Sequence, residues 1–220
     1  AGRGCCGSRG RQGCCGSRRG EGRRQAEQVI LVVGLGNPGK AYAHTRHNFG
    51  FEVVDRVVSR AGGGAYRDKF SGAFTEVVVQ GERVAALKPQ TFMNDSGRSV
   101  LAASSFYKLD AKDVLVVHDE LDLPFGDIRF KKGGGEAGHN GVRSVSQHLG
   151  TKDFVRLRLG VGKPPSGFRG TGADFVLEGF ASAERAVLGD LVEQAADAVE
   201  LFVGRGLEHS MNVTNRRRTD

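Results

Sequence analysis

Apolar residues occur along this chain in two alternating patterns. Short continuous runs, of the kind that form buried strands, alternate with segments in which apolar residues recur every three or four positions, as on one face of a helix. The runs predict strands over residues 29–33, 73–79, 83–87 and 114–117, with a short strand-like segment over 127–131 and an alternating strand over 154–162. The helical spacing predicts helices that start near residue 51 and that cover residues 98–107, 142–149 and 181–203.

This alternation predicts one α/β domain with a hairpin inserted at residues 73–87. Strands that are separated by helices pair in parallel, whereas the strands of a hairpin pair antiparallel. We therefore expect a single-domain α/β/α sandwich on a twisted, mixed, mostly parallel sheet.

The loop after the first strand is the stretch around which we expect the chemistry to be organised. Residues 34–39 are rich in glycine and proline and end the strand, and Asn37 and His47 lie before the next helix. Ligands of open α/β sheets bind at the carboxyl ends of the strands. Histidine is also a natural base near neutral pH, since its ordinary pKa is ~6.5. We interpret His47 as the candidate chemical centre.

The same loop matches the dinucleotide-binding pattern G-x-G-x-x-G at Gly34, Gly36 and Gly39. In that fingerprint the helix opens inside the motif, so that its N-terminus holds the pyrophosphate. Here Pro38 interrupts the motif, and the downstream acid Asp55 falls inside a predicted helix rather than at the end of a second strand. We therefore reject the fingerprint and keep nucleotide binding only as a third hypothesis.

Polar groups also follow the later strands, and each has an ordinary structural interpretation beside a functional one. Asn94 either caps the helix at 98–107 or faces a site, and Asn140 either caps the helix at 142–149 or does the same. The acids Asp119, Glu120 and Asp122 could bind a divalent metal, could be solvated turn residues, or could include a partner for a histidine.

Basic residues surround a second glycine-rich loop at 133–138. Lys131 and Lys132 precede it, and Arg156 and Arg158 share one face of a predicted strand. Such cations either bind phosphates or pair with acids and solvent.

Charge is concentrated in the first residues of the chain. Of the formal net charge of +7, residues 1–24 carry +6. The segment 1–27 also holds all four cysteines and cannot bury a core, so we expect a disordered Gly/Arg/Cys-rich extension, followed by one domain over 28–220. The alternatives are an organelle transit segment or a metal site at the paired cysteines. The nearly neutral domain would bind nucleic acid only through a local patch.

Five motifs taken together resemble the bacterial-type peptidyl-tRNA hydrolase family, in order and in spacing. The resemblance covers residues 28–215. The motifs are Gly34-Leu35-Gly36-Asn37-Pro38-Gly39, Thr45-Arg46-His47-Asn48, Phe92-Met93-Asn94, His118-Asp119-Glu120-Leu121-Asp122 and Gly133-Gly134-Gly135 with Gly138-His139-Asn140-Gly141.

The resemblance implies hydrolysis of the ester that joins a peptide to tRNA, with His47 as the base and Asp119 as its partner. It implies a substrate-binding group formed by Asn37, Tyr42, Met93, Asn94, His139 and Asn140. It also implies tRNA contacts by Lys131, Lys132, Arg156 and Arg158, a monomer, and no metal or cofactor. One departure is Glu136-Ala137, which places an acid in the loop expected to meet phosphate.

The residues themselves agree with this chemistry. A histidine oriented by a carboxylate can activate water, and amide side chains can stabilise an oxyanion. Residues 28–220 contain no cysteine and no G-x-S-x-G elbow, which argues against a covalent intermediate. The alternative is a non-hydrolytic RNA-binding protein on the same fold. We expect a cytoplasmic protein without a membrane span, or one of an organelle matrix if residues 1–27 are a transit segment.

Overall fold

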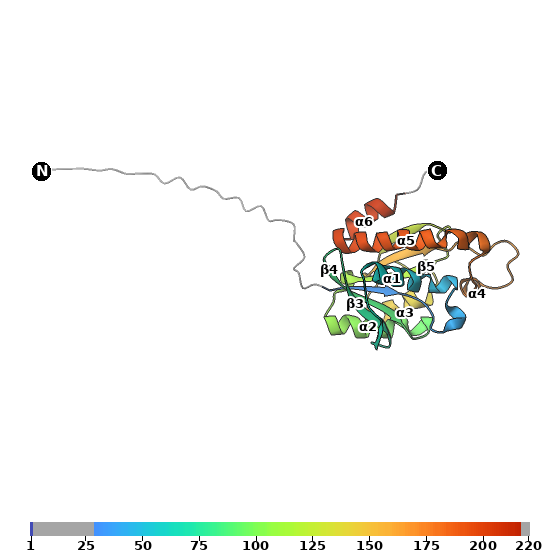
Figure 1. Ribbon diagram of the computed structural model, residues 1–220, viewed down its shortest axis with the longest axis horizontal. Coiled ribbons are helices and arrows are strands. Elements are labelled where there is room, and N and C mark those ends of the chain that lie inside the picture. Colours follow the sequence, from blue (N-terminus) through green and yellow to red (C-terminus); the bar gives the residue numbers. More distant parts are fainter. Residues whose placement is uncertain (2–28, 217–220) are drawn as a thin grey trace.

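The protein is seen here in a computed structural model, which describes Ala1 and residues 29–216 (Figure 1). Residues 2–27 of the predicted extension, with all four cysteines, therefore lie outside the described residues, as do residues 217–220, and the boundary at residues 27–28 stays a prediction. Within the described residues, no helix combines the length and the apolar character needed to cross a bilayer.

One seven-stranded mixed sheet forms the centre of the fold. Its strand order is β2-β3-β4-β1-β5-β7-β6, and its four middle strands, β4, β1, β5 and β7, run parallel. Antiparallel pairs lie at both edges of the sheet. On one side β2 pairs with β3 and β3 with β4, and on the other side β6 pairs with β7. The strands are β1 (Ile30–Gly34), β2 (Arg67–Lys69), β3 (Gly72–Val79), β4 (Glu82–Pro89), β5 (Val114–Glu120), β6 (Ile128–Lys132) and β7 (Val155–Gly160).

Helices cover both faces of this sheet, which makes the three layers that the sequence predicts (Figure 1). Helices α1 and α5 pack on one face and α2 and α3 on the other, each pair over its own apolar cluster. The α-helices are α1 (Phe49–Arg60), α2 (Ser96–Tyr107), α3 (Asn140–Leu149), α4 (Gly172–Val176), α5 (Ser182–Arg205) and α6 (Leu207–Thr214). Single 3₁₀ turns are η1 (Lys40–Tyr42), η2 (Arg46–Asn48), η3 (Met93–Asp95) and η4 (Ala111–Asp113).

The crossings on opposite faces create a topological switch beside β1. The chain leaves β1 towards α1 on one face and leaves β4 towards α2 on the other. The loops after neighbouring parallel strands therefore separate at one edge of the sheet, which is where α/β proteins bind ligands.

A glycine at the start of α1 allows the helix to approach this edge closely. A Cβ atom on Gly50 would lie 2.5 Å from the Val117 carbonyl oxygen and 2.7 Å from that of Leu35. Only a residue without a side chain lets the backbone of α1 touch the residue after β1 and the middle of β5. This contact sets the position of η2, the turn immediately before α1.

The side chain of Asn215 forms hydrogen bonds with the backbone of β6 at the edge of the sheet. The Oδ1 atom of Asn215 accepts a bond from the Phe130 N–H (2.7 Å), and its Nδ2 donates to the Phe130 carbonyl (2.9 Å). The end of α6 is thereby tied to the last strand of the sheet.

Three elements were not predicted from the sequence. Strand β2 is a charged, partly exposed segment of three residues, so it carries no apolar run. Helix α4 follows a Gly/Pro-rich loop, and α6 lies beyond the last predicted helix, which covers residues 181–203. The β5 strand also continues through His118 and Asp119, which places these polar residues inside the sheet rather than in a turn.

Candidate active site

A cleft of about 630 Å³ lies at the carboxyl ends of the parallel strands. It collects residues from η2, η3, the end of β5, the loop before α3, and α4. Seven of the site residues predicted from the sequence line it: Asn37, His47, Met93, Asn94, Asp119, His139 and Asn140.

The centre of the cleft is a histidine–carboxylate pair. The Nδ1 atom of His47 lies 3.0 Å from both carboxylate oxygens of Asp119. Because an ionised carboxylate only accepts hydrogen bonds, Nδ1 carries the proton and donates it. In the neutral imidazole the lone pair is then on Nε2, which is the form a general base requires.

A second histidine holds the other side of the same carboxylate. Backbone N–H groups of Gly141 and Val142 donate to Nδ1 of His139 at 3.1 and 3.3 Å, so this side chain caps the N-terminus of α3. The proton of the neutral ring is therefore on Nε2, which lies 3.0 Å from Oδ1 of Asp119. The helix terminus thus fixes the tautomer that orients Asp119.

Electrostatic interactions shift the pKa values of His47 and Asp119 in opposite directions. Burial by itself lowers the pKa of His47, but the charge and the hydrogen bond of Asp119 outweigh it, so the pKa of His47 is raised. Burial alone would raise the pKa of Asp119, and the two histidines bring it far below its usual range. Asp119 is therefore ionised at neutral pH, next to an imidazole that readily accepts a proton.

Asn37 is held in the cleft by its own network. Its backbone N–H donates to Oδ1 of Asn48 (2.7 Å), and Asn48 Nδ2 donates back to the Asn37 carbonyl (3.0 Å). The Oδ1 atom of Asn37 accepts a bond from the Met93 N–H at 2.9 Å. Its Nδ2 group is then available as a donor.

The other two asparagines are exposed on the cleft wall. Asn94 lies in η3, and the residue that precedes α2 at its N-cap is Asp95, so Asn94 is not the helix cap. Asn140 is the first residue of α3, whose cap is His139. The capping alternative is therefore wrong for both asparagines, while their part in binding stays a prediction.

Tyr42 is half-buried in η1 and is not among the residues that line the cleft. Its backbone carbonyl accepts bonds from the N–H and the hydroxyl of Thr45. Tyr42 therefore contacts the turn that carries His47 through its backbone carbonyl.

The predicted tRNA-contacting cations lie in different environments. Lys132 is exposed and Lys131 is partly exposed at the end of β6. Arg158 is partly buried and donates from Nε to Glu120 Oε2 at 2.9 Å. The acids Glu120 and Asp122 therefore have different partners: Glu120 pairs with Arg158, and Asp122 lies 3.4 Å from Lys163.

Arg156 differs from the expectation, because it is buried. Its Nη1 and Nη2 groups donate to the carbonyls of Gly135 (2.7 Å) and Gly134 (3.0 Å). The guanidinium therefore supports the glycine-rich loop from beneath instead of facing solvent. The acid in that loop, Glu136, pairs with Lys152 at 2.8 Å.

One group of residues in the described part of the chain has the proximity of a metal site. The candidate ligand atoms of His47, Asp119 and His139 all lie within 4.8 Å of one another. These atoms already bond to each other or to the start of α3, so a metal ion would have to replace those hydrogen bonds.

Several functional residues were missed by sequence reasoning. The apolar wall of the cleft consists of Phe92, Leu121, the α4 residues Ala173 and Val176, and Leu177, which follows α4. The signal for α4 was present, because Thr171 and Asp174 form a capping box. His118 was also missed: it is buried, its Nδ1 donates to the Asp119 carbonyl at 2.7 Å, and its ring packs edge-on against His139.

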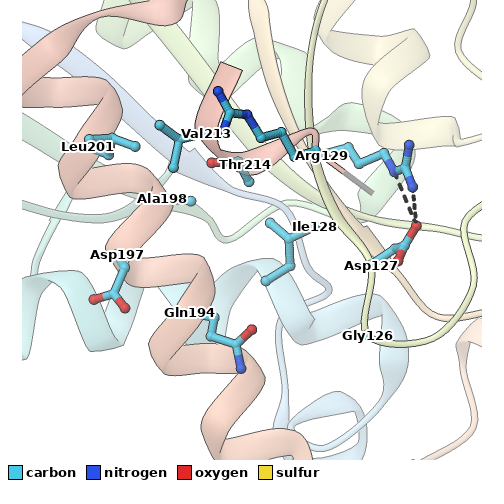
Figure 2. Close-up of a pocket in the computed structure, with 11 residues that line it drawn as sticks. Gly126, Asp127, Ile128, Arg129, Gln194, Asp197, Ala198, Leu201, Val213 and Thr214 are labelled. Atoms are coloured by element: carbon cyan, nitrogen blue, oxygen red, sulfur yellow. Dashed lines mark hydrogen bonds and ion pairs between the residues drawn. The ribbon is translucent and has the colours of Figure 1, made fainter. Parts of the chain in front are cut away.

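A second cavity, of about 410 Å³, lies between β6, α5 and α6 (Figure 2). Figure 2 shows Arg129 paired with Asp127 at one side and Gln194, Asp197 and Leu201 of α5 at the other. None of the predicted catalytic or substrate-binding residues lines this cavity.

A family model, two curated relatives and a solved structure that resemble this chain all carry the same family name. Residues 31–220 match the family model described as peptidyl-tRNA hydrolase. A peptidyl-tRNA hydrolase from Sorangium cellulosum is 52% identical over 189 residues, which cover 86% of this chain and 85% of the relative. One from Mycolicibacterium smegmatis is also 52% identical, over 86% of this chain and 98% of the relative. The solved peptidyl-tRNA hydrolase from Acinetobacter baumannii superposes with a TM-score of 0.80 at 38% identity, over 89% of this chain and 98% of that one.

Proposed function

This chain belongs to the peptidyl-tRNA hydrolase family, and we propose that it hydrolyses the ester between peptide and tRNA with a water molecule activated by His47. The observation that carries the proposal is the hydrogen bond from His47 Nδ1 to the Asp119 carboxylate, which leaves Nε2 as a base facing the cleft. The relatives give no support to a non-hydrolytic RNA-binding role.

The reaction follows from this geometry in two proton transfers. Nε2 of His47 removes a proton from water as the oxygen attacks the ester carbonyl, and Asp119 stabilises the imidazolium that forms. The tetrahedral intermediate then collapses, and the imidazolium returns the proton to the ribose oxygen that leaves. No covalent bond to the enzyme is formed in this route.

The asparagines supply neutral hydrogen-bonding groups around the reacting ester. The held amide of Asn37 presents Nδ2 as a preorganised donor for the developing oxyanion or the attacking water. Asn94 and Asn140 line the same cleft and suit the polar backbone of a peptide. The apolar wall that includes Phe92 and Val176 suits the peptide side chains.

The tRNA portion of the substrate would lie along the end of β6 and the glycine-rich loop. Lys132 and Lys131 offer cations there, and Arg158 lies on the neighbouring strand. Arg156 would act through the loop carbonyls that it holds.

Every group in the proposed mechanism comes from one copy of the chain. We therefore expect a monomer to be active, with the domain of residues 28–220 sufficient for turnover. Because peptidyl-tRNA arises during translation, we expect the working enzyme in the cytoplasm.

The test is the release of N-acetyl-aminoacyl groups from tRNA, measured with EDTA present. Replacing His47 with Ala should reduce kcat by about 10²–10⁴-fold, the usual loss when a general base is removed, while substrate binding is mostly retained. His44→Ala is a matched control, because His44 is an exposed histidine of the same loop.

Two results would contradict the mechanism. Undiminished turnover by His47→Ala would exclude His47 as the base. Loss of wild-type activity in EDTA, restored by a divalent ion, would instead make the cluster of His47, Asp119 and His139 a metal site.

A further inference from the structure

Helix α4 forms part of the cleft wall but is too short to hold its place alone. It has five residues, and Gly172, Ala173, Val176 and Leu177 at this position line the cleft. An isolated helix of this length is unstable in water, so its position depends on contacts with the rest of the protein. The preceding loop, residues 163–171, is mostly exposed and contributes the Thr171 cap and the ring of Phe168, which packs edge-on against Phe175.

One buried arginine makes a large part of these contacts. Arg46 is only 4% exposed, and its Nη1 donates to the Gly179 carbonyl at 2.6 Å. Its Nη2 pairs with Glu184 Oε2 at 2.7 Å, and Glu184 itself accepts a bond from the Ala181 N–H (2.6 Å) at the start of α5. The guanidinium therefore binds the chain on the C-terminal side of α4 at two separate points.

The rings around α4 enclose the same guanidinium. Its Cζ lies 4.1 Å from the ring centroid of Phe175 and 5.3 Å from that of Phe180, within cation–π range. The backbone N–H of Arg46 also donates to the Glu178 carbonyl (3.1 Å), and Thr45 forms a β-bridge with Gly179.

Arg46 is directly followed by His47. We infer that Arg46 is a positioning residue for substrate binding: it fixes the apolar α4 wall of the cleft to the turn that carries the base. This inference rests on the proposed function and adds to it the means by which the apolar part of the substrate is held beside His47. The wall would take the peptide or acyl group, because its cleft-facing side chains are apolar.

The inference predicts a specific kinetic change. The bond between His47 and Asp119 uses none of the atoms of Arg46, so the chemical step should be retained when Arg46 is replaced. A displaced wall weakens binding of ground state and transition state alike, which raises KM and leaves kcat nearly unchanged. For Arg46→Met we expect KM to rise about tenfold and kcat to change by no more than about twofold.

Arg46→Lys separates the shape of the group from its charge. A single ammonium can reach Glu184 or the Gly179 carbonyl, but it lacks the planar fork that serves both. We expect a KM between those of the wild type and Arg46→Met. The Lys variant also carries the test if Arg46→Met does not fold.

Arg60→Met is the matched control. Arg60 also joins an N-terminal element to α5, through Glu193, Asp197 and Glu200, but on a face remote from the cleft. Removing it should change stability without changing KM. The increase in KM for the Arg46 variants should also be larger for a substrate with a bulky apolar acyl group than for N-acetylglycyl-tRNA.

Amide hydrogen exchange of residues 172–179 tests the anchoring without using activity. Exchange should be at least about tenfold faster in Arg46→Met and unchanged in Arg60→Met, because local opening of α4 becomes easier. Unchanged KM and exchange in the Arg46 variants would overturn the inference, and so would a fall in kcat alone. If the wild type releases no acyl group, the proposed function fails, and the exchange rates alone decide whether Arg46 anchors α4.

Discussion

The carboxylate of Asp119 determines the state of both histidines that it contacts. It lies in a strand, it is 2% exposed, and its backbone carbonyl is held by the ring of His118. A group with so little freedom keeps His47 in one tautomer and one orientation before substrate arrives. Such preorganisation costs little at the moment of reaction.

The raised pKa of His47 gives a pH dependence of defined sign. Catalysis needs the neutral imidazole, so kcat/KM should fall as the pH drops through this pKa, with a midpoint above the ordinary value of 6.5. In Asp119→Asn burial is no longer opposed by the carboxylate, so the pKa of His47 should fall and the acid limb should move to lower pH. The rate itself should fall by up to about 10⁴-fold.

The profile of kcat/KM between pH 5 and 8 measures both effects. An acid limb that stays in place in Asp119→Asn would show that another group controls it.

At the level of single residues, sequence reasoning located polar groups better than it located their partners. Asn37 and His47 follow β1 and Asp119 lies near the end of β5, and the edge rule for parallel sheets predicts that they meet. The role of His139 as a helix cap, and the burial of Arg156, depend on contacts between distant segments. Neither contact leaves a periodic signal in the sequence.

Close packing of α1 against the sheet is what gives the His47 turn its position. The start of this helix touches the backbone just after β1 and in the middle of β5, so η2 cannot move without moving the helix. Stability and catalysis should therefore be coupled at Gly50.

Replacing Gly50 with Ala should destabilise the protein by about 1–3 kcal/mol, because the new methyl group would meet rigid backbone atoms rather than a flexible side chain. The free energy of unfolding in urea measures this loss. Gly189→Ala in α5 is the control: a Cβ there has no neighbour within 4 Å, and alanine favours helix by about 0.5–1 kcal/mol. Equal stability of the two variants would contradict the packing argument.

Among the elements, strongly periodic segments were predicted and short ones were not. The apolar runs of β1, β3, β4 and β5 and the helical spacing of α1, α2, α3 and α5 arise from burial, which acts over many residues. A three-residue strand or a five-residue helix is stabilised by tertiary contacts, as α4 is by Arg46, and local sequence contains little of that information.

At the scale of the whole molecule, the net charge outside the first 24 residues is close to zero. Residues 25–220 carry a net charge of only +1, so their affinity for tRNA must come from a few cations near the cleft. The dependence of binding on salt should accordingly be modest.

The double variant Lys131→Ala/Lys132→Ala should raise KM for N-acetyl-aminoacyl-tRNA and reduce the slope of log affinity against log salt by about 0.7–0.9 for each phosphate that is no longer neutralised. Turnover at saturating substrate should be retained, because neither lysine belongs to the hydrogen-bonded pair of His47 and Asp119. Arg205→Ala removes an exposed cation at the far end of α5 and should leave the slope unchanged. A slope that is the same in all three proteins would place the phosphate-binding cations elsewhere.

The contact between Asn215 and Phe130 has a consequence for how copies of this protein coexist. An open sheet ends in a row of unpaired backbone groups that can recruit a strand from a neighbouring molecule. Asn215 occupies one such donor and acceptor on β6 at once, as a strand of a second copy would, and the opposite edge is the short, charged β2. A side chain at the end of the last helix thus occupies a point on the β6 edge where a strand of a second copy would otherwise pair.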